Sequence, residues 1–245
     1  MRSRALVSTL AVALFLVAWE AAPRLGLVDP FFTSRPSQVL AAGVDVLRGG
    51  TLMHDAAVSL SELAAGFALA LAVGVPLGLM LGTFPTARHL VDPPLMAVYA
   101  TPQLALLPIF VLWLGIGMAS KVAVVFLGAS IPIIVNSMAG VRHVERSLVV
   151  AARSFCATRL DVFTKVILPA SLPGVMIGIR LGLSRAVLGV VVAEMYVAQD
   201  GIGNQIMRLG SAFRVDRLLV YVLLVSAFGL GATTAVRKLE ERMAR

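Results

Sequence analysis

Cysteine and charge are both scarce in this sequence. Its 245 residues include one cysteine, Cys156, and only 14% of them are charged. A lone cysteine excludes an internal disulfide and any metal site made of several cysteines. A soluble domain has about a quarter charged residues, which it keeps on its surface. The composition therefore excludes an ordinary soluble globular protein.

Signatures of catalysis and nucleotide binding are also absent. The sequence has no glycine-rich phosphate loop followed by lysine, so any ATP and Mg that it depends on must be bound by another chain. His54, His89 and His143 lie at the edges of apolar segments without an HExxH pattern, and we interpret them as interfacial residues rather than metal ligands. We therefore predict no catalytic residue, no metal site and no cofactor within this chain.

Apolar residues dominate what is present. They make up 59% of the chain, and the mean hydropathy is +0.92. Several runs are long enough to cross a hydrocarbon core of about 30 Å as helices. We predict an all-α, polytopic membrane protein with a single domain over residues 1–245. Its six predicted transmembrane helices are 5–22, 55–82, 91–114, 121–140, 170–195 and 218–236.

Lysine and arginine lie mostly at the ends of these segments. The net charge is +8, but the basic residues do not gather on one face with aromatics, which favours a lipid membrane over nucleic acid as the partner. With the amino terminus inside, 12 of the 21 lysines and arginines fall on the inner side and 7 on the outer side. The positive-inside rule then predicts that both termini and the loop 142–169 are cytoplasmic.

The first apolar run has a second interpretation. Its basic start and apolar centre also fit a signal peptide. Trp19 and Glu20 occupy positions where a cleavage site would have small residues, so we favour a retained first helix.

One polar, basic stretch, from Val149 to Pro173, interrupts the apolar segments. Two groups of apolar residues recur at helical spacing within it, one before Cys156 and one after. The sequence predicts two short amphipathic helices with a break near Cys156, and it predicts that the second helix ends at Pro169.

Motifs in and around this stretch resemble a known family. They are AARS at Ala151–Ser154, KVILPASLPG at Lys165–Gly174, GIRLGLS at Gly178–Ser184, VAEM at Val192–Met195 and the run Ala100–Gly117. The set resembles the permease subunits of bacterial binding-protein-dependent ABC importers, most closely the nitrate, sulfonate and taurine group. In that family the stretch is called the EAA loop and docks on a cytoplasmic ATPase. A glutamate and a glycine usually stand there where this chain has Val150 and Cys156.

The resemblance implies a role, partners and a location. The chain would be the permease of an ATP-driven importer in the bacterial inner membrane, and it would act as a homodimer. A cytoplasmic ABC ATPase would bind ATP and Mg, and an extracytoplasmic solute-binding protein would deliver a small anion such as a sulfonate, taurine or nitrate. An ATPase-independent channel or membrane scaffold is the alternative. The residues implied in coupling to the ATPase are Ala151, Ala152, Arg153, Ser154, Cys156, Ala157, Lys165 and Pro169.

Prolines and charges inside the predicted spans are candidates for the solute pathway. A charge in hydrocarbon costs at least about 2.5–3.5 kcal/mol unless it faces water or a partner. Prolines crowd the segment 91–114 and predict a kinked or broken helix, and broken helices line transport pathways. The pathway and substrate candidates are Glu62, Pro102, Pro108, Arg185 and Glu194.

Two specific contacts are predicted for these charges. Glu62 and Arg185 lie at depths within about 5 Å of each other, so we expect them to pair or to line the pathway together. The alternatives are a buried pair with a purely structural role, or Arg185 packed against helix ends. Glu194 lies near the end of the fifth span, where we expect it to contact the next loop.

Overall fold

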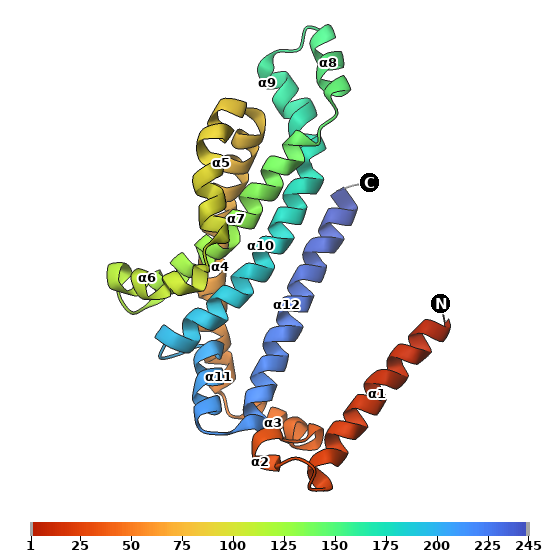
Figure 1. The fold of residues 1–245 in the computed structure, drawn as a ribbon, viewed down its shortest axis with the longest axis vertical. Helices are drawn as coiled ribbons and strands as arrows, with labels where there is room; N and C mark the ends of the chain where they lie inside the picture. The colour runs from red at the N-terminus through yellow and green to blue at the C-terminus, as the bar shows by residue number, and fades with distance from the viewer. Residues whose placement is uncertain (1, 244–245) are drawn as a thin grey trace.

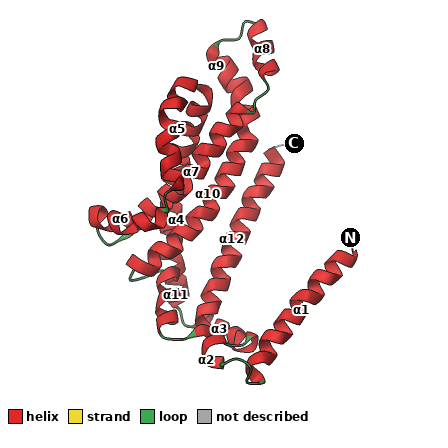
Figure 2. Ribbon diagram, in the orientation of Figure 1, coloured by secondary structure: helices red, strands yellow, loops and turns green. Residues whose placement is uncertain are grey.

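The computed structural model describes residues 2–243, without the side chains of residues 2–5, 8 and 30. This part of the chain is helical with short loops and contains no strand (Figure 1 and Figure 2), which confirms the all-α prediction. The α-helices are α1 Arg2–Arg24, α2 Pro30–Thr33, α3 Pro36–Arg48, α4 Thr51–Thr83, α5 Pro85–Ala100, α6 Leu107–Leu114, α7 Met118–Arg142, α8 Arg146–Ser154, α9 Arg159–Val162, α10 Leu168–Val197, α11 Ile202–Ser211 and α12 Val215–Met243. A 3-10 helix, η1 Gln103–Leu106, precedes α6, and a π-helix, η2 Phe163–Ile167, joins α9 to α10.

The central helix of the bundle is α7, which packs against both α4 and α10. Small residues allow these helices to approach closely. A Cβ added to Gly78 of α4 would lie 2.6 Å from the carbonyl oxygen of Ile134, and Gly174 of α10 faces Gly140 of α7 in the same way. Such contacts between small residues are how helices associate in membranes, where lipid tails offer no hydrophobic advantage.

Four helices in the described part of the chain are long and apolar enough to cross a membrane. They are α4, α7, α12 and the continuous helix from Arg159 to Val197, which is made of α9, η2 and α10. The bent pair of α5 and η1–α6 brings the number to as many as five. The first predicted span, 5–22, falls on α1, where several side chains lie outside the described residues. The count of six spans therefore stays a prediction.

The proline-rich segment is broken, as its sequence predicts. The chain turns by 88° between α5 and η1–α6, at Thr101 and Pro102. Thr101 has an extended ψ of 134°, because a proline disfavours helical geometry in the residue before it. The turn carries η1 and α6 away from the bundle axis (Figure 1).

The prediction that Pro169 ends a helix is wrong. The helix runs through Pro169 without interruption from Arg159 to Val197. Proline lacks the N–H that a helix interior needs, and its ring clashes with the carbonyl four residues earlier. The π-helix η2 lies directly before it, and there the Leu168 N–H bonds to the carbonyl of Phe163, five residues back. This wider turn shifts the hydrogen-bond register just where the proline would disrupt an α-helix.

The two ends of the bundle differ. At one end α8 and α9 project beyond the other helices (Figure 1), and we call it the coupling end. At the opposite end α11 and α3 pack against the start of α12. From there α12 runs back toward the coupling end, so the last described residues point that way (Figure 1).

Candidate functional site

The coupling segment, residues 142–169, leaves large apolar side chains uncovered. Helix α8 has no buried residue. The Phe155 side chain at its end is 88% exposed, and Leu160 of α9 is 71% exposed. Leu148 and Val150 are exposed as well. A surface of this kind at a bundle end is typical of a contact with another protein.

Cys156 breaks the coupling segment between its two helices, as predicted. Its φ is +58°, in the left-handed region where a β-carbon is strained. The Cys156 N–H donates to the Arg153 carbonyl at 2.9 Å, and the Ala157 N–H donates to the Ala152 carbonyl at 3.2 Å. These two bonds form a Schellman motif, in which the left-handed residue is usually glycine.

Thr158 starts α9 immediately after this break. Its hydroxyl accepts the Asp161 N–H at 3.2 Å, and its own N–H donates to the Asp161 carboxylate at 3.2 Å. Asp161 also pairs with Lys165 at 2.6 Å. Reciprocal bonds of this type form a capping box, which fixes a helix start. The spacing T-x-x-D is the sequence signal for such a box, which is not among the features predicted above.

The residues implied in coupling are all accessible from outside the chain. Each of the eight, from Ala151 to Pro169, is exposed or half-buried. A cavity of about 710 Å³ separates the segment from the end of α4, and Arg153, Arg159, Thr83 and Phe84 are among the residues that line it. The segment is therefore not packed tightly onto the bundle on this side. Its firm connection is the continuous helix into α10.

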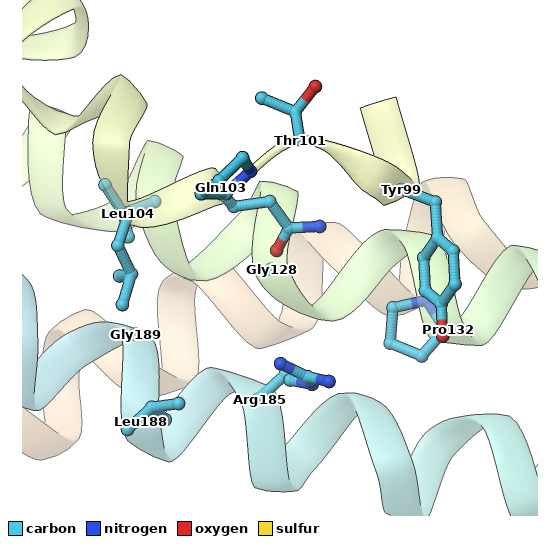
Figure 3. Close-up of a pocket in the computed structure, with 11 residues that line it drawn as sticks. Tyr99, Thr101, Gln103, Leu104, Gly128, Pro132, Arg185, Leu188 and Gly189 are labelled. Atoms are coloured by element: carbon cyan, nitrogen blue, oxygen red, sulfur yellow. The ribbon is translucent and has the colours of Figure 1, made fainter. Parts of the chain in front are cut away.

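Arg185 and Pro102, both pathway candidates, lie at one cavity of about 380 Å³ between the α5–η1 turn, α7 and α10. The sharp turn at Pro102 brings Tyr99 and Gln103 over this space, and Figure 3 shows the Gln103 amide and the Arg185 guanidinium reaching into it from opposite sides. Leu188 and Pro132 are among the apolar residues that line it. Pro108, in the first turn of α6, is not a lining residue.

The structure does not pair Glu62 with Arg185. Glu62 forms an ion pair with Lys121 of α7, and the two side chains are only 3% and 7% exposed. Arg185 lies on an exposed face of α10 and has no carboxylate partner among the described residues. Equal depth along the helices did not imply contact, because Glu62 points from α4 toward Lys121 of α7, while Arg185 points into the cavity under the α5–η1 turn.

Glu62 belongs to a buried group at the end opposite the coupling segment, which we call the polar cluster. The cluster also contains Ser59 and Asp55 of α4, Lys121 of α7 and Glu194 of α10. All five residues are less than 9% exposed, and Glu194 is fully buried. Two carboxylates outside the ion pair thus lie within the protein, where each requires donors.

Those donors come from the loop between α10 and α11 and from the start of α11. The Gly203 N–H donates to Glu194 at 2.7 Å, and the Ile202 N–H donates to the Ser59 hydroxyl at 2.9 Å. Asp55 accepts the Gly201 N–H at 3.1 Å and the Gln205 amide at 3.0 Å. Glu194 thus contacts the connection between the fifth and sixth predicted spans, as predicted, through Gly203 at the start of α11. A helix N-terminus suits carboxylates because its free N–H groups point outward.

Comparison with known proteins covers nearly the whole chain. Residues 74–245 match the family described as "Binding-protein-dependent transport system inner membrane component". The taurine transport system permease protein TauC of Escherichia coli is 32% identical, over 97% of this chain and 87% of that protein. The putative aliphatic sulfonates transport permease protein SsuC of Bacillus subtilis is 30% identical, over 94% of this chain and 84% of its own length.

A solved structure shares the fold. It is a chain of the MetNI methionine ABC transporter in an inward-facing conformation, with a TM-score of 0.71 and 18% identity, covering 80% of this chain and 97% of that one. The family match begins within α4 and includes the coupling segment and the Arg185 cavity.

Proposed function

Because the chain belongs to the binding-protein-dependent transport system inner membrane component family, we propose that it is the permease of an ATP-driven importer for a small organic anion. Membership makes it a multi-pass transmembrane subunit of an ABC transporter. We further propose which surface docks on the ATPase, that the chain forms a homodimer, which end of the bundle faces the cytoplasm, and which class of solute is transported.

The exposed apolar surface of the coupling segment carries the proposal. Phe155 follows α8 and Leu160 belongs to α9, the two helices that project beyond the others at the coupling end (Figure 1), and both side chains are largely uncovered. With this end in the cytoplasm, lipid would not cover them. We propose that the ATPase subunit packs against both side chains. Exposed aromatic anchors of this kind often dominate the energy of an interface.

The continuous helix from Arg159 to Val197 supplies the mechanical link. It carries α9 at one end, Arg185 about two-thirds of the way along and Glu194 near its other end. When ATP closes a pair of ATPase subunits, the movement of α9 would pass along α10 to the Arg185 cavity. Alternating access then follows from the differential binding of ATP to two arrangements of the same helices.

A homodimer accounts for the face of α10 that carries Arg185. That face is exposed in the single chain, yet a charge at mid-membrane depth is unfavourable against lipid. A second copy of the chain would enclose the cavity between the two subunits. We also propose that the coupling end and both termini are cytoplasmic, which agrees with the charge distribution and with the direction of α12 (Figure 1).

The solute in this proposal is a sulfonate, taurine or a comparable small anion, delivered by an extracytoplasmic binding protein. The names of the similar proteins, a taurine permease and a putative aliphatic sulfonate permease, support this class.

Gentle purification of the tagged chain from its native membrane tests the proposal. We expect an ATPase subunit to be recovered in stoichiometric amount, with ATP hydrolysis in the purified complex. Phe155→Ala is expected to reduce recovery of the ATPase at least about tenfold, since loss of a central aromatic anchor typically costs 2 kcal/mol or more. Uptake of the solute into membrane vesicles should fall with it.

Leu230→Ala is the matched control, because Leu230 is an exposed apolar residue on α12, far from the coupling segment. It should retain the ATPase at the level of the unmodified chain. The alternative, an ATPase-independent channel or scaffold, predicts a different result. The chain would then be recovered without any ATPase, and Phe155→Ala would leave ion or solute flux unchanged.

A further inference from the structure

We propose that Arg185 and Gln103 form an oxyanion-binding site inside the permease, which holds the acidic group of the solute in transit. The inference rests on the proposed function and names the chemistry that the transmembrane site itself selects. Its evidence is the position of Arg185, the absence of a countercharge and the polarity of the surrounding cavity.

Arg185 lies deep within the membrane-spanning helix. It is twelve residues before Val197, the last residue of α10, which corresponds to about 18 Å at 1.5 Å per residue. The other end of the helix is farther still. Long basic side chains extend to the membrane surface when they lie near the ends of a spanning helix, and Arg185 is near neither end of α10. Its charge must therefore be met by water, by a protein group or by a ligand within the pathway.

No protein countercharge meets it within the described part of the chain. The cavity around Arg185 is lined by eleven residues, none of them acidic. The carboxylates of Glu62 and Glu194 are held in the polar cluster, and Arg180 is the residue that approaches Glu240. A second copy packed by a twofold axis would repeat the same lining residues, none of which is acidic.

The other polar groups in the cavity are neutral. Gln103 points its amide toward the space that the Arg185 side chain also enters, and the Tyr99 ring borders it beside Pro132 (Figure 3). Thr101 points away from the space in the same view. Leu104 and Leu188 supply apolar walls. A fixed cation with neutral hydrogen-bonding groups and apolar walls favours a ligand that has one anionic group and a short carbon body.

The guanidinium selects the shape of that anionic group. Its planar fork donates two parallel hydrogen bonds to a pair of oxygens on a sulfonate, a carboxylate or nitrate. A cavity of about 380 Å³ lies near the lower end of the range of about 300–1,000 Å³ for small-molecule sites. The site therefore suits small oxyanions, because a neutral solute has no anionic pair of oxygens to accept these two hydrogen bonds.

Ligand-dependent thermal unfolding of the intact complex, purified with its ATPase, tests this site without ATP and without the binding protein. The probe is ethanesulfonate, and the comparison is ethanesulfonamide, which is neutral and nearly the same shape. At concentrations up to about 50 mM, at constant ionic strength, we expect ethanesulfonate to raise the unfolding midpoint and ethanesulfonamide not to, because only bound ligand stabilises.

Substitutions in the cavity give the second arm. Arg185→Leu should raise the half-saturating ethanesulfonate concentration about tenfold to a hundredfold, as expected for loss of charge-assisted hydrogen bonds. Arg185→Lys, which keeps the charge and loses the fork, should fall between that variant and the unmodified complex. Gln103→Leu should weaken binding about twofold to tenfold, as expected for one neutral hydrogen bond. Lys238→Leu removes one exposed positive charge from the end of α12 and should change nothing.

Three results would overturn the site. They are no shift with ethanesulfonate in the unmodified complex, an equal shift with ethanesulfonamide, or unmodified half-saturation in Arg185→Leu. If Arg185→Leu fails to assemble, unmodified half-saturation in both Arg185→Lys and Gln103→Leu overturns it. Failure of the importer proposal looks different: no ATPase would be recovered with the chain, and ethanesulfonate would still raise the unfolding midpoint of the chain purified without it.

Discussion

The polar cluster and the coupling segment lie at opposite ends of the bundle and satisfy their side chains in opposite ways. In the polar cluster, charged groups are buried and meet partners from distant parts of the same chain, such as Asp55 with Gly201 and Glu62 with Lys121. In the coupling segment, hydrogen bonds are local, as between Thr158 and Asp161, and the apolar Phe155 has no cover within the described residues.

This difference shows which end of the molecule is complete. A buried charge without its partner is strongly destabilising, so the polar cluster must be assembled whenever the chain is folded. An exposed apolar anchor gains its contacts only when another protein arrives. We therefore expect changes in the polar cluster to act on folding, and changes in the coupling segment to act locally and on assembly.

The largest effect is expected from breaking the ion pair of the polar cluster. Lys121→Met leaves the Glu62 carboxylate buried without its cation, which should lower the free energy of unfolding by about 3–5 kcal/mol. Denaturant unfolding of the purified chain in detergent measures this change. A loss below about 0.5 kcal/mol, the usual range of surface substitutions, would contradict it.

Two further variants identify the partner. Lys121→Met combined with Glu62→Gln removes both charges and should recover most of the lost stability, because no charge is then left unpaired. The double exchange Glu62→Arg with Arg185→Glu should recover none of the stability lost in either single variant, since the structure places Lys121, not Arg185, beside Glu62. Recovery of stability in that exchange would instead support the Glu62–Arg185 pair predicted from the sequence.

A smaller effect is expected at the anchor of the α10–α11 loop. Asp55→Ala removes the acceptor of the Gly201 N–H and of the Gln205 amide, and buried donors left without a partner cost about 1–3 kcal/mol. Hydrogen exchange of the amides around Gly201 should accelerate accordingly. Asp45→Ala, at an exposed aspartate of α3, is the control. Equal exchange rates around Gly201 in Asp55→Ala and Asp45→Ala would contradict the anchoring role of Asp55.

Local signals in the sequence predicted the features that depend on local geometry. Pro102 disfavours a helical Thr101, so the break in that segment was predictable. Cys156 stands where two helical patterns end and begin, and the structure turns there. Glu194 ends a long apolar run, so its contact with the next loop followed from its position along the chain.

Features that depend on packing were not predictable in the same way. The sequence gives the depth of Glu62, but its direction around α4 is fixed by the close approach of α7, and that approach made Lys121 its partner. Pro169 is a helix stop by local rules. Here the π-helix before it lets the helix continue, which a residue pattern does not reveal. The Arg185 cavity likewise needs the turn at Pro102 to be folded over α10.

At the coupling segment the next prediction concerns the start of α9. Thr158→Ala removes the capping box, and loss of such a cap typically costs about 1 kcal/mol. We expect faster hydrogen exchange in α9 with an unchanged global unfolding midpoint, unlike the two polar-cluster variants. Thr164→Ala serves as control, since this exposed threonine only bonds back to its own helix at Leu160. A fall in global stability as large as that of Asp55→Ala would erase the contrast between the two regions.

The smallest effect, and the only gain, is expected at Cys156. Its β-carbon is strained by about 1–2 kcal/mol at a positive φ. Glycine would remove this strain, but it also makes the unfolded chain more flexible, which costs about 0.4–1 kcal/mol of stability. Cys156→Gly should therefore stabilise the break by about 0–1.6 kcal/mol, seen as slower exchange at position 156 and at Ala157. Cys156→Val should act in the opposite direction, because β-branched residues suit this region least. If both variants exchange alike, the turn adapts to its residue, and the coupling segment is held by its continuous helix into α10 rather than by the geometry of the break.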